Sequence, residues 1–188
     1  LDYHESKLVS DLAVEKPELY VALYLNDYSE SPWYKQLDLG GEKTSGITRK
    51  ASLRTMQKAV KRFLTQTNIL SDTEPENVAK LISDFWCAVV SLLENEWANP
   101  RKHFLTKGIG VYSLMSLAAD IYQETHVQKE QYDINYFSGV LSDFIYLIDW
   151  SSNGHFVGLG GESGVQQALE IIRKTRQKSK LKMVSHGQ

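Results

Sequence analysis

The sequence predicts a mainly α-helical protein with little or no sheet, an irregular bundle of six to eight helices around one buried helix. Apolar residues recur at steps of three and four over most of the chain, which is typical of amphipathic helices. The 188 residues are 42% hydrophobic and 23% charged, the composition of an ordinary globular protein. A chain of this length can bury one sizeable core, so we expect residues 1–188 to form a single helical domain.

Charge is unevenly distributed although the formal net charge is only -2. The charged residues in 1–30 are mostly acidic, whereas those in 43–62 and 173–182 are all basic. The net charge therefore gives no global signal for nucleic acid, but local basic patches are predicted. A solvated helix face and a frayed tail are the alternative explanation for these patches.

Two short helices are predicted between Tyr3 and Leu25 from their apolar spacing. Pro17 fits the first turn of the second helix, where its missing N–H costs nothing. The segment PELYVALYL is apolar on nearly every side, so we expect the second helix to be buried.

Trp33 and Tyr34 follow in a predicted loop between Pro32 and the doublet Gly40-Gly41. One interpretation is that the two rings pin this loop to the core, as aromatic pairs in loops usually do. The alternative is a stacking platform for nucleic-acid bases, worth about 1–3 kcal/mol per base. The first interpretation is favoured.

A strongly basic amphipathic helix is predicted next, capped by Thr48 or Ser52 and running to about Gln66. Its polar face carries no acidic residue, whereas ordinary solvated helices mix signs and gain from i,i+4 pairs. This face is a candidate for contacts to nucleic-acid phosphates; a plain surface helix is the alternative. The candidate residues are Arg49, Lys50, Arg54, Lys58, Lys61 and Arg62.

A long helix is predicted over residues 75–97, and residues 85–93 within it are hydrophobic on every side. We expect this segment to be the centre of the core. Cys87 lies in it and is the only cysteine, which excludes a disulfide framework and fits a reducing cytoplasm. Burial is expected to raise the pKa of its thiol and to make it inert.

An exposed basic connector is predicted after Asn99 and Pro100. The run KGIGV within it lacks the spacing of a phosphate loop, so its glycines are interpreted as a turn before a helix over residues 110–125. A further helix is predicted over residues 134–150, with Gly139 at a close helix–helix contact. A buried strand is the alternative for its FIYLI segment.

The last helix is predicted to begin at a cap formed by Ser163, after a glycine-rich loop that must use positive φ angles. Cations in its final turns suit the helix dipole. A glycine-rich loop that opens a helix is also an anion-binding geometry, and a plain capped turn is the alternative. The candidate anion-binding residues are Gly160, Gly161, Ser163 and Gly164.

No catalytic constellation, metal site or cofactor is predicted for these residues. The five histidines are scattered singly, and the run G-E-S-G is one residue short of a nucleophile elbow. No run approaches the ~20 apolar residues that a membrane span requires. We therefore expect a cytoplasmic protein without membrane contact and without a catalytic site in this part of the chain.

Three stretches together resemble the C-terminal region of DGQHR-domain proteins. They are LN-x-x-x-E-SPWY-x₂-L-x-LGG over residues 25–41, the basic helix over residues 49–64, and the turn G-x-GG-x₂-G-V over residues 158–165. The naming signature D-G-Q-H-R is absent, as it would be if the front of the family's chain were missing. Because the chain also begins without Met, we expect it to be the C-terminal part of a longer protein.

The resemblance implies a bacterial cytoplasmic protein linked to DNA-modification and phage-defence gene islands, including the phosphorothioate and deazapurine systems. It places any catalytic chemistry in the missing N-terminal part, which looks related to the ParB and sulfiredoxin fold. We accordingly expect an accessory helical domain that contacts nucleic-acid backbone. The alternatives are an interaction or scaffold module that binds an acidic partner or its own acidic segment, and an enzyme that holds phosphate at residues 158–164.

Overall fold

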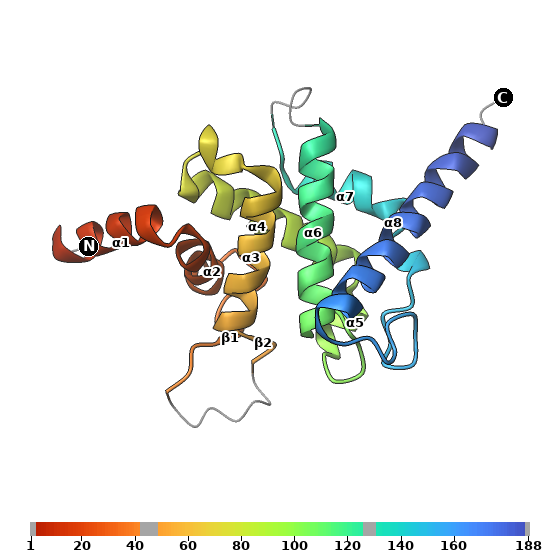
Figure 1. Cartoon of the computed structure of the whole chain (residues 1–188), viewed down its shortest axis with the longest axis horizontal. Coiled ribbons are helices and arrows are strands. Elements are labelled where there is room, and N and C mark those ends of the chain that lie inside the picture. Colours follow the sequence, from red (N-terminus) through yellow and green to blue (C-terminus); the bar gives the residue numbers. More distant parts are fainter. Residues whose placement is uncertain (1–2, 42–48, 126–130, 187–188) are drawn as a thin grey trace.

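The computed structural model describes residues 3–41, 49–125 and 131–186. This part of the chain contains eight α-helices, two 3₁₀ turns and one two-stranded parallel sheet, which confirms the predicted mainly α fold (Figure 1). The strands are β1 (Leu37–Asp38) and β2 (Ala51–Ser52). The helices are α1 (Tyr3–Glu15), α2 (Pro17–Asp27), α3 (Leu53–Thr67), α4 (Pro75–Leu92), α5 (Glu94–Ala98), α6 (Gly108–Thr125), α7 (Ile134–Ser142) and α8 (Gly161–His186).

Helix α6 lies at the centre of the molecule, between α3 on one side and α8 on the other (Figure 1). It is buried on nearly every side from Gly110 to Tyr122. The segment over residues 85–93, which the sequence indicated as the centre, contributes buried Phe85, Trp86 and Leu93, but Cys87 is only half-buried. The core therefore has two principal helices, and α6 is the more enclosed because it has helices on both flanks.

The expected helix over residues 75–97 is in fact two helices. Leu93 leaves the helical conformation with φ -125° and ψ 47°, and α5 begins at the next residue. The break lets Leu93 enter the core and turns Trp97 toward Trp33, with the two ring centroids 5.0 Å apart. The continuous apolar sequence gave no indication of this break.

The helix expected over residues 134–150 ends at Ser142 and is followed by a 3₁₀ turn, Ile145–Leu147. The strand alternative for this segment is wrong. The turn is fixed by Trp150, whose buried Nε1 donates a hydrogen bond to the carbonyl of Ile145 at 3.0 Å. The close helix contact expected at Gly139 is also wrong, because nothing lies within 4 Å of the position of an added Cβ.

Two helices lie in the N-terminal segment as predicted, and the starts of α2 and α3 are those that the sequence indicates. Pro17 opens α2, and Ser52 caps α3 by accepting a hydrogen bond from the backbone N–H of Thr55 at 3.0 Å. Thr48, the other predicted cap, lies outside the described residues. The apolar face of α3 is buried through Met56, Ala59, Val60 and Phe63.

Trp33 pins the loop after α2 to the core. Its ring is fully buried and lies edge-on to Trp86, with the ring centroids 5.1 Å apart, and edge-on to Trp97. Tyr34 remains 36% exposed at the surface. The pinning interpretation is therefore confirmed for Trp33, because a fully buried ring cannot stack on a base.

Candidate nucleic-acid interface

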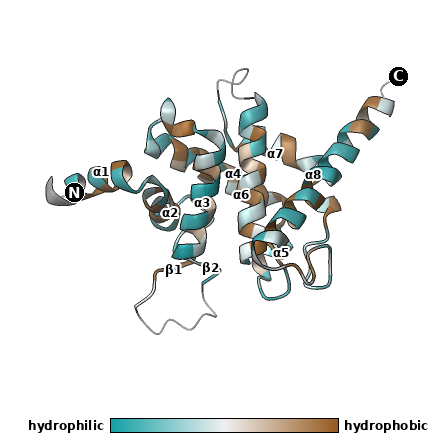
Figure 2. Ribbon diagram, in the orientation of Figure 1, coloured by the Kyte–Doolittle hydropathy of each residue, from teal (hydrophilic) through white to brown (hydrophobic). Residues whose placement is uncertain are grey.

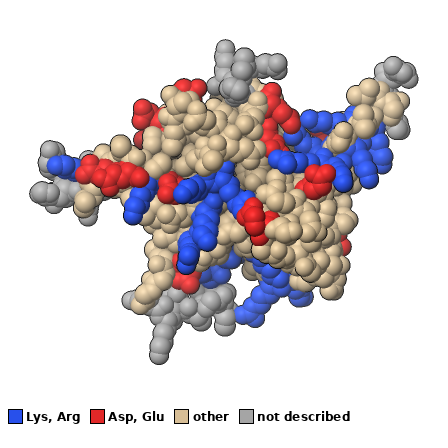
Figure 3. Space-filling view, in the orientation of Figure 1, with Lys and Arg blue, Asp and Glu red and all other residues tan. Residues whose placement is uncertain are grey.

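The polar face of α3 presents Arg54, Lys58 and Lys61 to solvent. None of the three forms an ion pair with a described residue. Figure 2 shows that the side of α3 facing the viewer is largely hydrophilic. In Figure 3, Lys and Arg atoms form a band over this helix. These three members of the predicted basic set are thus available to an external anion.

Arg62 is used inside the protein instead. Its guanidinium forms an ion pair with Glu162, in the first turn of α8, and lies 5.1 Å from the centre of the Tyr112 ring. The hydrogen bond from Arg62 lowers the pKa of Glu162. Arg62 therefore fastens α3 to α8 and is a weaker candidate for phosphate contact than its neighbours.

Lys50 also has a structural role. Its ammonium donates a hydrogen bond to the carbonyl oxygen of Trp97 at 3.0 Å and lies 4.9 Å from the centre of the Trp97 ring. Burial lowers the pKa of this lysine. The contact joins the segment before β2 to the end of α5, although the two residues are 47 positions apart in the chain.

This contact creates a basic hollow that the sequence did not reveal. Residues 49–50 form one part of its wall and residues 98–107 form the other, around a volume of about 540 Å³. No acidic side chain lines it among the described residues. We call it the cationic groove, and its charged lining residues are Arg49, Lys50, Arg101, Lys102 and Lys107.

The second wall of the cationic groove is held by backbone hydrogen bonds. The N–H of Phe104 donates to the carbonyl of Trp150 at 2.7 Å, and the N–H of Ser152 donates to the carbonyl of Lys102 at 2.8 Å. Lys107 lies 4.7 Å from the centre of the Phe104 ring. The connector that the sequence indicated as an exposed basic loop therefore has a fixed backbone, with its cationic side chains at the surface.

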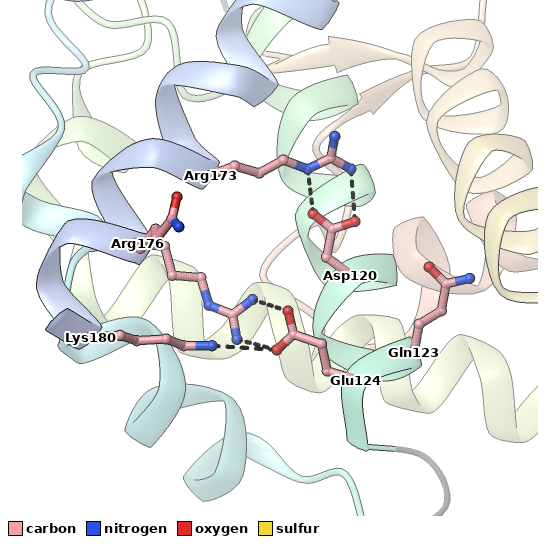
Figure 4. A pocket seen from close by; sticks show the side chains of 7 residues that line it. Asp120, Gln123, Glu124, Arg173, Arg176 and Lys180 are labelled. Atoms are coloured by element: carbon pink, nitrogen blue, oxygen red, sulfur yellow. Dashed lines mark hydrogen bonds and ion pairs between the residues drawn. The ribbon is translucent and has the colours of Figure 1, made fainter. Parts of the chain in front are cut away.

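The cations of α8 contrast with those of the groove, because several have acidic partners on α6 (Figure 4). Arg173 binds Asp120 at 2.7 Å, Arg176 binds Glu124 at 2.8 Å, and Lys180 lies 3.5 Å from the same Glu124. These pairs neutralise much of the basic C-terminal run and tie α8 to α6. Arg49, Arg101, Lys102 and Lys107 form no such pair with a described residue.

The start of α8, where the sequence predicted an anion site, differs from the prediction in its helix start and its cap. The helix begins at Gly161 and not after Ser163, and the N–H of Gly164 donates to the carbonyl of Gly160 at 3.0 Å. The predicted cap at Ser163 is therefore wrong. Glu162 puts a carboxylate in the first turn, where it suits the helix dipole and repels an external anion.

The glycines of this loop have conformational and packing roles. Gly158 and Gly161 have φ angles of +77° and +61°, which confirms the expectation of positive φ. An added Cβ at Gly164 would lie 2.9 Å from the carbonyl carbon of Leu159. The glycine-rich sequence is explained by a tight turn into α8.

Residues 3–41, 49–125 and 131–186 contain no group of three or more His, Cys, Asp or Glu residues that can hold a metal ion. No helix in these ranges is long and apolar enough to cross a membrane. Cys87 is half-buried, with its Sγ 3.6 Å from the carbonyl oxygen of Glu30, and burial raises the pKa of its thiol.

The unpaired basic surface is thus the most distinctive feature of the described chain. Comparisons with protein-family models, curated proteins and solved structures found no match. The resemblance to DGQHR-domain proteins therefore stays a prediction from the sequence.

Proposed function

We propose that this chain is an accessory helical domain of a bacterial, cytoplasmic DNA-modification or regulatory protein, and that it binds the nucleic-acid backbone through α3 and the cationic groove. The observation that carries the proposal is the distribution of unpaired cations. They gather on α3 and in the groove, whereas the cations of α8 are largely paired. The resemblance to DGQHR-domain proteins supports the link to DNA modification.

The two basic regions are adjacent along the chain. Arg49 and Lys50 directly precede β2, and Arg54 is in the first turn of α3. From Arg54 to Lys61 the helix rises about 10 Å, which spans about three phosphates of one strand measured along a duplex axis. Unpaired cations at this spacing release condensed counterions when they neutralise phosphates, and this release favours binding.

Reversing the charge of Lys58 and Lys61 together is expected to weaken duplex binding. Each phosphate contact contributes about -0.9 to the slope of log K against log salt, so Lys58→Glu with Lys61→Glu should flatten the slope by about two units. At low salt we expect at least about a tenfold loss of affinity, because two attractions become repulsions. Fluorescence anisotropy of a labelled duplex between about 50 and 200 mM salt measures both quantities.

The matched control is Lys174→Glu with Lys178→Glu. These residues are also exposed and change the net charge equally, but they lie on α8, where Lys174 forms an ion pair with Glu170 at 3.3 Å. A smaller effect of the control pair shows that the position of the charge matters and not only its total. The proposal fails if the wild-type chain does not bind duplex at low salt, or if both pairs weaken binding equally.

Self-association is a second candidate function, favoured by the two helices that project from opposite ends of the molecule (Figure 1). On α1, Leu8 is 69% and Val14 is 82% exposed, and near the end of α8, Leu181 is 63% and Val184 is 71% exposed. Opposite ends cannot meet within one chain, so a second copy is the occupant that this candidate specifies. The charges of the two ends differ in sign, with Asp11 and Glu15 on α1 and Lys178 on α8, beside Lys174 and Lys180, which already pair with Glu170 and Glu124.

Replacing Leu181 and Val184 by Asp is expected to abolish such association, because it places charges in the apolar contact and opposes the acidic α1. Sedimentation velocity over a range of concentrations measures the association of the wild-type chain and of this variant. Ser185→Asp is the control at a neighbouring exposed polar position. If the wild-type chain sediments as a monomer at every concentration, this candidate is wrong.

A further inference from the structure

We propose that the cationic groove binds the terminal phosphate of a nucleic-acid strand in preference to a phosphodiester within the strand. This inference rests on the proposed backbone binding and names the part of the nucleic acid that the groove recognises. It assigns separate tasks to the two basic regions. The face of α3 follows the backbone, and the groove holds the phosphorylated end.

The shape of the groove favours an end over a continuous backbone. Its two walls come from segments far apart in sequence, residues 49–50 and residues 98–107, and they border an open hollow of about 540 Å³. Sites that surround small ligands typically have about 300–1,000 Å³. An internal phosphate of a duplex lies on a convex surface and can be approached from one side only. A strand end is narrow enough to enter between two walls.

The charge of the groove also favours a terminal phosphate. A phosphomonoester carries about -1.5 to -2 charges at pH 7 and three acceptor oxygens, whereas a phosphodiester carries one charge. The ammonium of Lys50 already donates a hydrogen bond to Trp97. This leaves four lining cations whose side chains form no ion pair or hydrogen bond with a described residue, and one of these, Lys107, also lies over the Phe104 ring. Two of them are arginines, whose planar guanidinium groups can each donate two parallel hydrogen bonds to phosphate oxygens. The four are Arg49, Arg101, Lys102 and Lys107.

The lining of the groove predicts recognition without base preference. Among the described residues it contains no aromatic side chain on which a base can stack. Two rings lie beside the lining, and each has a groove lysine over its face: Lys50 lies 4.9 Å from the centre of the Trp97 ring and Lys107 lies 4.7 Å from that of Phe104. The groove is therefore equipped to hold the phosphate and not the base attached to it.

The test compares two labelled duplexes of one sequence that differ only in a 5′-phosphate on a short overhang. We expect the phosphorylated duplex to bind the full chain about five- to tenfold more tightly, since each tenfold corresponds to about 1.4 kcal/mol. Arg101→Gln with Lys102→Gln should remove this preference, because both side chains are exposed groove residues. Lys58→Glu with Lys61→Glu should weaken both duplexes equally and leave the preference unchanged.

The preference should also decrease as the pH falls from about 7.5 to 5.5, because the second pKa of a phosphomonoester is near 6. A nucleoside monophosphate is added as competitor to separate the end of a strand from a free nucleotide. We expect it to compete only at concentrations far above the Kd of the phosphorylated duplex, because it lacks the contacts along α3. Thermal unfolding of the Arg101→Gln, Lys102→Gln variant shows whether it is folded.

Equal affinity for both duplexes, with binding that still depends on salt and on Lys58 and Lys61, overturns this inference and leaves the proposed backbone binding intact. Competition by the nucleoside monophosphate at the Kd of the duplex also overturns it, and assigns the groove to a free nucleotide. If neither duplex binds at low salt, both the inference and the proposed function are wrong.

Discussion

Replacing Trp33 by Ala is expected to lower the free energy of unfolding by about 3–5 kcal/mol, the usual cost of removing a large aromatic side chain from a core. Trp33 is fully buried and lies edge-on to Trp86 at 5.1 Å and to Trp97 at 5.0 Å between ring centroids. Deleting it removes both ring contacts and leaves a cavity that its neighbours cannot fill. Urea denaturation measures the loss through the shift of the midpoint.

Tyr34→Ala is the matched control, because the neighbouring ring is partly exposed and makes no edge contact with the core tryptophans. We expect it to cost less than about 1 kcal/mol. A loss of similar size in the two variants would contradict the pinning role of Trp33. The Trp33 variant is also expected to loosen the contact that holds the two walls of the groove together. Trp33 packs against Trp97, and the carbonyl oxygen of Trp97 accepts the hydrogen bond from Lys50.

The helices could be predicted wherever a local signal marks their ends. Pro17, Ser52 and Pro75 each mark a start, because proline and serine favour the first positions of helices for local reasons. The ends at Leu92 and Ser142 were missed. In both places the burial of a side chain beyond the helix, Leu93 or Trp150, determines the break, and no proline or glycine directly follows the helix to mark its end.

The exposed cations of α3 could be predicted because the sequence shows that they have no acidic neighbours on the helix. The role of Arg62 could not, since its partner Glu162 is 100 positions away. The cationic groove was missed for the same reason. Its two walls are joined by the contact of Lys50 with Trp97, which depends on the break at Leu93.

Replacing Gly110 by Ala is expected to destabilise the protein by about 3 kcal/mol and to disturb the groove. An added Cβ would lie 2.6 Å from the carbonyl oxygen of Leu105 and closer still to that of Phe104. These are main-chain atoms, so the clash cannot be relieved by rotating a side chain, and overpacking of this kind costs about 1–3 kcal/mol or more. Either the first turn of α6 or the connector over residues 98–107 must move.

Gly139→Ala is the matched control, since this helical glycine of α7 is exposed and has nothing within 4 Å of the added Cβ. Alanine should stabilise that helix by about 0.5–1 kcal/mol, because glycine loses more backbone freedom on folding. In urea denaturation, the Gly110 substitution is therefore expected to lower the free energy of unfolding and the Gly139 substitution to raise it. Because residues 98–107 form one wall of the groove, only the Gly110 variant should also lose the preference for a 5′-phosphate. If both variants are more stable than the wild type, the connector does not pack against α6 as described, and the groove loses its wall.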